Sequence, residues 1–163
     1  MFVRTASERD LETIKALLAE TWHATYDTIY GVERVNETTA EWHSVASLKA
    51  RLTRPNSEFL VADDGKLIAG MAFAAATSDP KVVMLHQLYV RPGKQGGGIG
   101  RMLIQEVEQC FPEARRLRLE VEAANDQAIR FYLANGFVRV GETANCGAEQ
   151  SGIPALIFEK KLG

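Results

Sequence analysis

The chain has 163 residues, of which 46% are hydrophobic and 25% charged, and its formal net charge is −2. This balance gives no reason to expect a nucleic-acid partner, and no apolar run approaches the roughly 20 residues that a membrane-spanning helix needs. The N-terminus lacks the apolar core of a signal peptide, so we expect one cytoplasmic domain over residues 1–163 with no membrane partner.

The N-terminal third is predicted to hold a strand and two helices. Residues 2–6 alternate as a strand does, and Ser7 followed by Asp10 forms an approximate capping box. Apolar side chains then recur at helical spacing in one stripe: Leu11, Ile14, Leu18 and Trp22. Residues 23–41 are rich in aromatics and are predicted to be irregular, and a second helix is expected over 41–52.

Three consecutive strands are predicted in the middle of the chain. Residues 58–63 and 67–77 flank an Asp-Gly turn, which is typical of a hairpin. Residues 82–90 continue as the third strand. A glycine run then leads into a helix that we expect over 98–111.

Strands surround one more helix in the C-terminal third. Residues 117–122 alternate as a strand, and Asn125 is expected to cap a helix that ends at the Asn-Gly step 135–136. The last two strands are predicted over 137–142 and 154–162. A strand–helix–strand unit implies parallel pairing and hairpins imply antiparallel pairing. The sequence therefore predicts an α/β (α+β) domain with a mixed sheet of about seven strands and four helices.

The cysteines and histidines carry no pattern of a metal site or a disulfide framework. Cys110 and Cys146 form no CxxC motif, and the three histidines lack the HExxH spacing. No metal is therefore expected. Nothing in the sequence marks either cysteine as a nucleophile of lowered pKa.

Residues 95–100, QGGGIG, place four glycines in six residues between a strand and a helix. Glycine carries an entropic cost in a folded chain, so this density indicates that something approaches the backbone closely. A glycine turn that opens a helix presents backbone N–H groups at the positive end of the helix dipole, and Arg91, Lys94 and Arg101 flank it. We therefore predict a phosphate-binding turn; the alternative is a tight connection without a ligand.

Two familiar phosphate-binding motifs do not fit this spacing. A P-loop that starts at Gly93 would need Lys and Ser or Thr where Ile99 and Gly100 stand. The dinucleotide fingerprint GxGxxG, started at Gly96 or Gly98, ends on a residue other than glycine. The phosphate-bearing ligand is thus expected to be of another kind.

Within 88–137, the segments LYVRPGKQGGGIGRMLI and LEVEAANDQAIRFYLANGF resemble the Gcn5-related N-acetyltransferase superfamily. The order of elements agrees over nearly the whole chain, which implies a splayed, mostly antiparallel sheet. In that family the first segment binds acetyl-CoA, with turn amides on the pyrophosphate and strand main chain on the pantetheine arm. The resemblance therefore assigns cofactor binding to Leu88, Tyr89, Val90, Gln95, Gly96, Gly97, Gly98, Ile99, Gly100 and Arg101.

The second segment matches the family's N-x-x-A-x-x-x-Y pattern at Asn125, Ala128 and Tyr132. The resemblance implies that Asn125 helps to hold the cofactor. It also implies that Tyr132 binds the cofactor and gives a proton to the departing thiolate, a proton that acyl transfer to an amine requires. The structural alternatives are an N-cap role alone for Asn125 and packing against Phe137 for Tyr132.

The same reaction requires a base that takes a proton from the amine. We favour Glu120, because some family members carry a carboxylate at the matching position. Other members place their acid on the preceding strand, where this chain has Met84. His86 and a water chain are the alternatives, and Glu120 also fits a solvated charge on the strand face.

The acceptor is predicted to be a primary amine, either a small molecule or a protein N-terminus. Family members commonly shape the acceptor site with the connection between the first two helices and with the last two strands. The segment that joins those two strands here is 142–154. Candidate substrate-binding residues are Tyr26, Tyr30, His86 and Glu122. We expect direct transfer in a ternary complex and, by resemblance, a homodimer. The alternatives are a non-catalytic CoA-binding sensor or interaction module and an acyltransferase that uses a different acyl-CoA.

Overall fold

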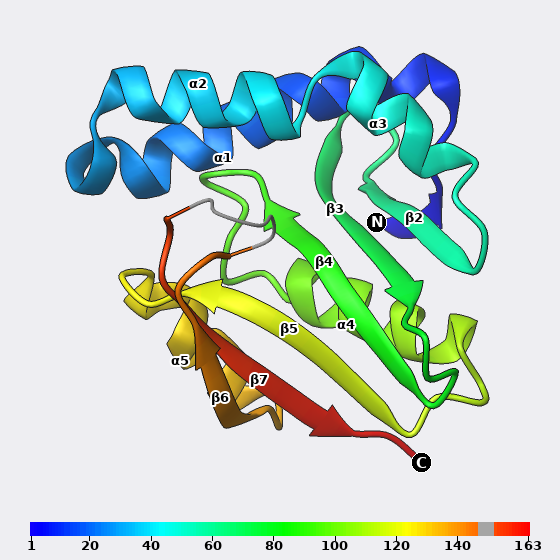
Figure 1. The fold of residues 1–163 in the computed structure, drawn as a ribbon. Coiled ribbons are helices and arrows are strands. Elements are labelled where there is room, and N and C mark those ends of the chain that lie inside the picture. The colour runs from blue at the N-terminus through cyan, green and yellow to red at the C-terminus, as the bar shows by residue number, and fades with distance from the viewer. Residues whose placement is uncertain (147–151) are drawn as a thin grey trace. The chain divides into compact units, whose positions relative to one another are not determined.

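The computed structural model describes residues 1–146 and 152–163. Figure 1 shows how the elements follow one another. In chain order they are β1 (Phe2–Thr5), a 3-10 helix (Glu8–Asp10), α1 (Leu11–Tyr30), α2 (Val32–Trp42), α3 (Val45–Leu52), β2 (Ser57–Asp63), β3 (Ile68–Ala76), β4 (Val82–Val90), α4 (Ile99–Cys110), β5 (Arg116–Glu122), α5 (Asp126–Ala134), β6 (Val138–Thr143) and β7 (Ala155–Lys161).

The strands form one sheet in the order β1-β2-β3-β4-β5-β7-β6. β4 and β5 pair in parallel, because α4 carries the chain back between them, whereas β1 with β2, β5 with β7 and β6 with β7 pair antiparallel. The predicted mixed, mostly antiparallel sheet of seven strands is confirmed. Pairing of β4 with β5 ends at Leu85 and Leu119, although β4 continues to Val90 and β5 to Glu122.

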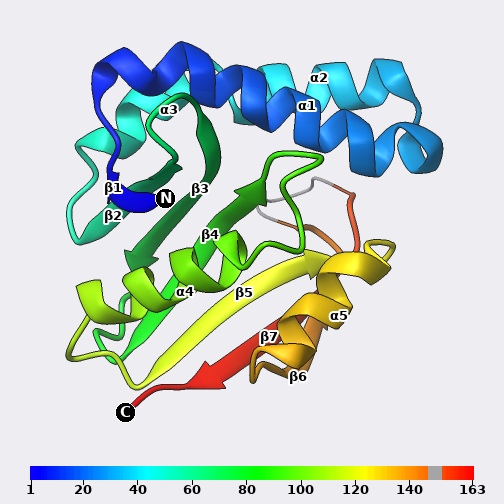
Figure 2. The same cartoon turned by 180° about the vertical axis from the view of Figure 1, so that it is seen from behind.

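The chain divides into two compact units. The first consists of Met1–Phe73 and Gln87–Val107, and the second of Ala74–His86 and Glu108–Gly163. In the second unit α5 lies on the face of β5, β6 and β7 that Figure 2 turns toward the viewer. The single-domain organisation over 1–163 stays a prediction.

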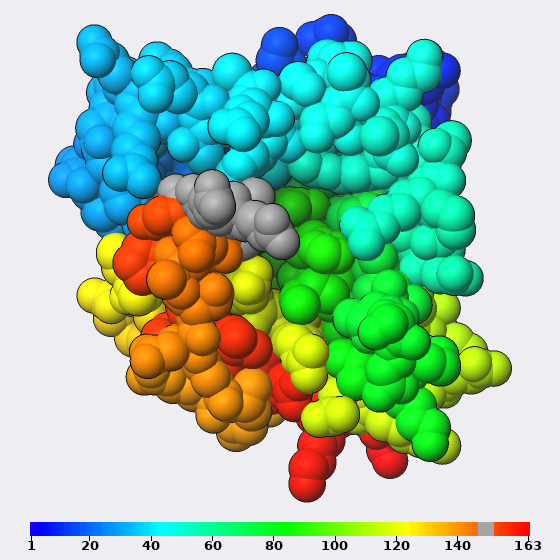
Figure 3. Space-filling model, viewed as in Figure 1, coloured from blue at the N-terminus to red at the C-terminus, as the bar shows by residue number. Residues whose placement is uncertain are grey.

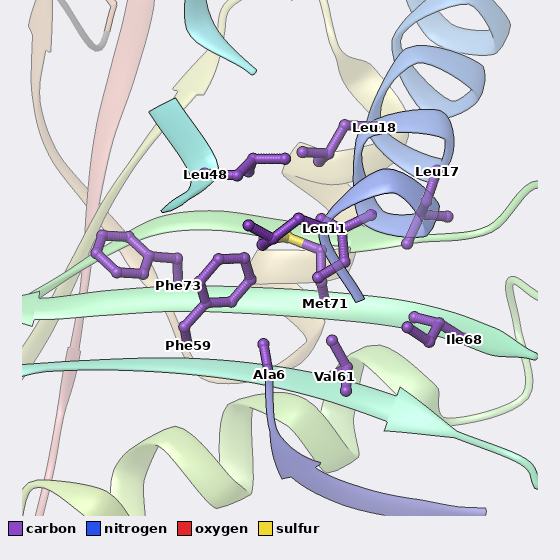
Figure 4. Packing of buried hydrophobic residues seen from close by; sticks show 11 residues of the cluster. Ala6, Leu11, Leu17, Leu18, Leu48, Phe59, Val61, Ile68, Met71 and Phe73 are labelled. Carbon is purple, nitrogen blue, oxygen red and sulfur yellow. The ribbon is translucent and has the colours of Figure 1, made fainter. Parts of the chain in front are cut away.

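In the first unit β3 is buried along nearly its whole length. Side chains of β2, β3, α1 and α3 meet in one apolar cluster, which Figure 4 shows from close by. The cluster includes Leu11, Ile14, Leu17, Leu18, Leu48, Phe59, Val61, Met71 and Phe73. At Gly70 the neighbours are instead side chains of α4, Ile99 and Leu103. Helices therefore cover both faces of this strand, which explains its continuous apolar sequence.

Residues 23–41, predicted to be irregular, are helical except at Gly31. α1 continues to Tyr30 because its apolar stripe extends from Trp22 to Tyr26, and both side chains are buried. The helix stops at Gly31, whose φ of +89° suits glycine. α2 then lies along α1, and with α3 it forms a continuous surface in Figure 3. The second predicted helix starts later than expected, at Val45.

An aromatic cluster ties α1 to β4 inside the first unit. The Trp22 indole N–H donates to the Tyr89 hydroxyl at 3.0 Å, and the Trp22 and Trp42 rings lie 5.5 Å apart, edge to face at 89°.

The His43 ring lies 6.2 Å from the rings of both Trp22 and Tyr89, and its Nδ1 lies 3.3 and 3.4 Å from the Arg51 guanidinium nitrogens. Burial, followed by the Arg51 charge, lowers the pKa of His43 to about 3, so this histidine is neutral at physiological pH.

We expect Asp10→Asn to lower the free energy of unfolding by about 2–3 kcal/mol at pH 7. The buried Asp10 carboxylate accepts hydrogen bonds from both terminal nitrogens of Arg4, at 2.8 and 2.9 Å, and from the Ser7 N–H at 2.8 Å. The change removes one of the two carboxylates that pair with the Arg4 guanidinium, and Asp63, 3.1 Å from Nε, remains. Urea denaturation measures the loss, and Glu12→Gln, at an exposed carboxylate of α1, is the control expected to stay within about 0.5 kcal/mol.

The pH dependence of the same pair has a definite sign. Hydrogen bonds from Arg4, the largest cause, and from Ser7 hold the pKa of Asp10 well below its usual range. This contribution is present above the unfolded pKa of about 3.9 and is lost as the pH falls through the lower folded value. Stability should therefore fall less steeply below pH 4 in the variant than in the wild type. Equal stabilities at pH 7 would contradict the prediction.

Candidate functional site

The glycine run connects the end of β4 to the start of α4. The Lys94 N–H donates to the Arg91 carbonyl at 2.9 Å, which closes a turn, and Gly93, Gly96 and Gly98 have φ of +87°, +85° and +84°. A residue with a side chain would be strained at these angles. Apart from the glycine itself and its two neighbours in the chain, no described protein atom lies within 4 Å of the place that a Cβ would take at these three positions.

The first turn of α4 starts from this open backbone. The Gly98 carbonyl accepts the Met102 N–H at 3.0 Å, so the N–H groups of Ile99, Gly100 and Arg101 precede the first helical donor. Such first-turn N–H groups have no acceptor within their helix, and the helix dipole favours an anion beside them. The residues present therefore fit a phosphate group, as the sequence predicts.

Arg91, one of the three basic residues that flank the turn, hydrogen-bonds to β3 and α1. The Arg91 guanidinium donates to the Ile68 carbonyl through Nε, at 3.2 Å, and Nη2, at 3.0 Å, and through Nη1 to Glu20 at 2.9 Å. Lys94 and Arg101 are exposed beside the turn. The Arg91 side chain therefore joins the turn to β3 and α1.

The last residues of β4 lie half-buried before the turn. The Arg91 N–H donates to the Ala69 carbonyl at 2.7 Å, so the main chain of Arg91 and, two residues earlier, of Tyr89 faces β3. The main-chain groups of Leu88 and Val90 therefore face away from β3. The Gln95 side-chain amide donates to the Val90 carbonyl at 3.2 Å.

The second unit gathers a carboxylate, a phenol and a thiol. Glu122, Tyr132 and Cys146 are 9%, 8% and 6% exposed, and the Cys146 Sγ lies 3.8 Å from a Glu122 carboxylate oxygen. Burial, followed by the Glu122 charge, raises the pKa of the Tyr132 phenol; burial and the charges of Glu122 and Glu120 raise the pKa of the Cys146 thiol. Both groups therefore keep their protons at neutral pH, which does not suit Cys146 as a nucleophile.

The structural contacts foreseen for two site residues are present. The Tyr132 ring lies 5.4 Å from the rings of both Phe131 and Phe137. The Asn125 side-chain oxygen accepts the Ala128 N–H at 3.2 Å and so caps α5. These contacts orient the two side chains and are compatible with a further role for each.

The candidate acceptor residues lie in both units. Tyr26 and Tyr30 belong to the first unit, where Tyr26 is 3% exposed and Tyr30 borders a hollow of about 550 Å³ at the junction of α1 and α2. In the second unit His86 is exposed on β4, and Glu122, at the end of β5, is buried; Glu120, the candidate base, is half-buried on β5. Of the predicted acceptor connection 142–154, residues 147–151 lie outside the described residues.

Two further observations concern the described part of the chain. Residues 1–146 and 152–163 contain no group of three or more His, Cys, Asp and Glu side chains placed to hold a metal ion. No helix among these residues is both long and apolar enough to cross a membrane.

Known proteins match this chain along most of its length. A family model described as the acetyltransferase (GNAT) family matches residues 13–137. The spermidine N(1)-acetyltransferase of Thermoplasma acidophilum is 30% identical over 83% of this chain and 86% of its own. The N-alpha-acetyltransferase RimI of Mycobacterium tuberculosis is 33% identical over 59% of this chain and 61% of its own.

Solved structures agree with this result. The PaiA N-acetyltransferase of Thermoplasma acidophilum, crystallised in complex with coenzyme A, superposes with a TM-score of 0.85 and 26% identity, over 98% of both chains. The ribosomal-protein-S18-alanine N-acetyltransferase of Escherichia coli shares the fold, with a TM-score of 0.72 and 17% identity over 99% of this chain and 94% of its own.

Proposed function

The chain belongs to the acetyltransferase (GNAT) family and is an N-acetyltransferase, and from this premise we propose that it moves the acetyl group of acetyl-CoA to a primary amine in a ternary complex. The turn before α4 is the observation that carries the cofactor assignment, because positive-φ glycines and first-turn N–H groups suit a pyrophosphate. The coenzyme A in the PaiA crystal structure supports the same ligand.

Each cofactor-binding residue has a proposed task. The turn residues 95–101 hold the pyrophosphate through main-chain N–H groups. The main chain of Leu88 and Val90 pairs with the pantetheine arm in the manner of an added strand, which their orientation away from β3 supports. Asn125 contributes a side-chain contact to the cofactor from the start of α5.

Proton transfers complete the proposed reaction. The amine nitrogen forms a bond to the thioester carbonyl carbon, and the carbon–sulfur bond then breaks. Glu120 takes a proton from the amine, directly or through water, and Tyr132 donates a proton to the departing sulfur. The raised pKa of Tyr132 keeps the phenol protonated at the moment the thiolate forms, and it also makes the phenol a weaker acid.

The acceptor is proposed only as a class. One relative is named an N-alpha-acetyltransferase and another a spermidine N(1)-acetyltransferase, and an α-amine and the N(1) amine of spermidine are both primary amines. Tyr26, Tyr30, His86 and Glu122 remain the candidate acceptor residues. The homodimer, the acetyl preference and the cytoplasmic location stay predictions.

Calorimetric titration tests the proposal first. We expect acetyl-CoA and CoA to bind the wild-type protein with dissociation constants between about 1 μM and 1 mM. Thiol release from acetyl-CoA is then measured with spermidine and with a peptide that has a free N-terminus. Binding without thiol release across an amine panel would favour the CoA-binding sensor, and the absence of binding would overturn the cofactor assignment.

A further inference from the structure

β3 contains one glycine at a place where the backbone needs no special angle. Gly70 lies inside a fully buried stretch of the strand, and its φ is outside the positive range that favours glycine. A glycine within a strand weakens it, unless another part of the chain must approach closely. The residues that pack against this position therefore explain why it is a glycine.

Those neighbours lie at both ends of the cofactor turn. A Cβ on Gly70 would sit 2.8 Å from the Tyr89 carbonyl oxygen, 3.2 Å from Ile99 Cγ2 and 3.3 Å from Leu103 Cδ1. Tyr89 is the second-last residue of β4, and Ile99 and Leu103 lie in the first two turns of α4. The missing side chain thus allows the strand that enters the turn and the helix that leaves it to pack on the same point of β3.

The two residues before Gly70 hold the turn as well. The Ala69 carbonyl accepts the Arg91 N–H at 2.7 Å, and the Ile68 carbonyl accepts the Arg91 guanidinium at 3.0 and 3.2 Å. Glu20 of α1 binds the other end of that guanidinium at 2.9 Å. Three successive residues of β3 therefore contact the segment on either side of 92–98.

We infer that the backbone of residues 68–70, here called the β3 seat, positions the cofactor turn, with Gly70 as a positioning residue that allows the close approach. The inference rests on the proposed binding of coenzyme A by the turn. Hydrogen-bond donors around an anion must be placed within a fraction of an ångström, so a small shift of α4 against β4 weakens binding. Gly70 itself does not touch the ligand.

The first test is Gly70→Ala. The nearest atom to the new Cβ is a main-chain oxygen at 2.8 Å, so backbone must shift, and we expect the dissociation constant of CoA and the KM for acetyl-CoA to rise at least about tenfold. At saturating acetyl-CoA kcat should stay within about threefold of the wild type. A general loss of structure would lower kcat as well, so this separation distinguishes positioning from misfolding.

The chain offers a matched control at Gly141 in β6. A Cβ there would meet Ile157 side-chain atoms at 3.7 and 3.9 Å, which is ordinary contact, so Gly141→Ala should leave CoA affinity within about twofold. If the wild type binds no CoA, the proposed function fails and the inference fails with it. If the wild type binds and Gly70→Ala binds equally well, only the inference is overturned.

A second variant tests the seat without a steric change. Glu20→Ala removes the partner that holds Arg91 on the Ile68 carbonyl. Removing a negative charge would strengthen the binding of an anion through electrostatics alone, whereas the seat predicts a rise of about twofold in the CoA dissociation constant. Glu12→Ala, at an exposed glutamate of the same helix, should show no such rise. Tighter binding by Glu20→Ala would contradict the inference.

Discussion

Replacing Tyr132 by Phe is expected to lower kcat about 100-fold and to leave the dissociation constant of CoA within about twofold. Tyr132 is 8% exposed, and burial together with the Glu122 charge keeps its phenol protonated. Phenylalanine retains the ring packing on Phe131 and Phe137 but has no proton to give. Steady-state kinetics and calorimetry on the same preparation measure the two effects.

The control variant keeps the Tyr132 hydroxyl and alters the packing around its ring. Phe137→Leu disturbs the packing around the ring and retains the Tyr132 hydroxyl, so it should cost about 1 kcal/mol of stability and leave kcat within a few-fold. Unaltered turnover in Tyr132→Phe would remove this residue as the proton donor. The ring would then serve only to pack α5 against the start of β6.

The second large effect is expected at the turn. Gly98→Ala should raise the dissociation constant of CoA at least tenfold, as measured by calorimetry. Its φ of +84° costs a residue with a side chain roughly 1–2 kcal/mol. The turn relieves this strain by changing its backbone angles, and those angles set the direction of the N–H groups in the first turn of α4.

Gly65 provides a control with the same backbone penalty. It has a φ of +92° in the hairpin between β2 and β3. As at Gly98, no described atom beyond the glycine and its two chain neighbours lies within 4 Å of the Cβ position. Gly65→Ala should lose a similar amount of stability and keep its CoA affinity. Equal CoA affinities in Gly98→Ala and Gly65→Ala would contradict the assignment of the turn to cofactor binding.

Local patterns in the sequence were sufficient to predict most elements. The alternation of β5, the Asn125 cap and the hairpin before β3 all depend on residues close together in the chain, and the structure confirms them. The helical nature of 23–41 was missed. Most polar residues there, Thr39 excepted, lie outside the buried side of α1 and α2. Burial of Tyr26 and Val35 fixes the inner side, and that burial depends on tertiary packing.

In the candidate site, too, features that depend on neighbouring residues were predictable and long-range contacts were not. The anion-binding turn was predictable, because glycines before a helix act through their own backbone. The partner of Arg91 was not, since Glu20 lies 71 residues away, and nothing near Cys146 indicates its contact with Glu122, 24 residues earlier. The reason for Gly70 is equally long-range, because its three neighbours belong to β4 and α4.

The aromatic cluster around Trp22 has an optical consequence. The chain contains two tryptophans, and both belong to this cluster in the first unit, at 5.5 Å and nearly perpendicular to each other. Indole fluorescence therefore reports on the first unit alone. The close, fixed pair of indole rings also gives a near-ultraviolet circular dichroism signal, which comes from the same two tryptophans. Since the Trp22 N–H is bonded to the Tyr89 hydroxyl, this emission is a label-free reporter of the strand that precedes the glycine turn.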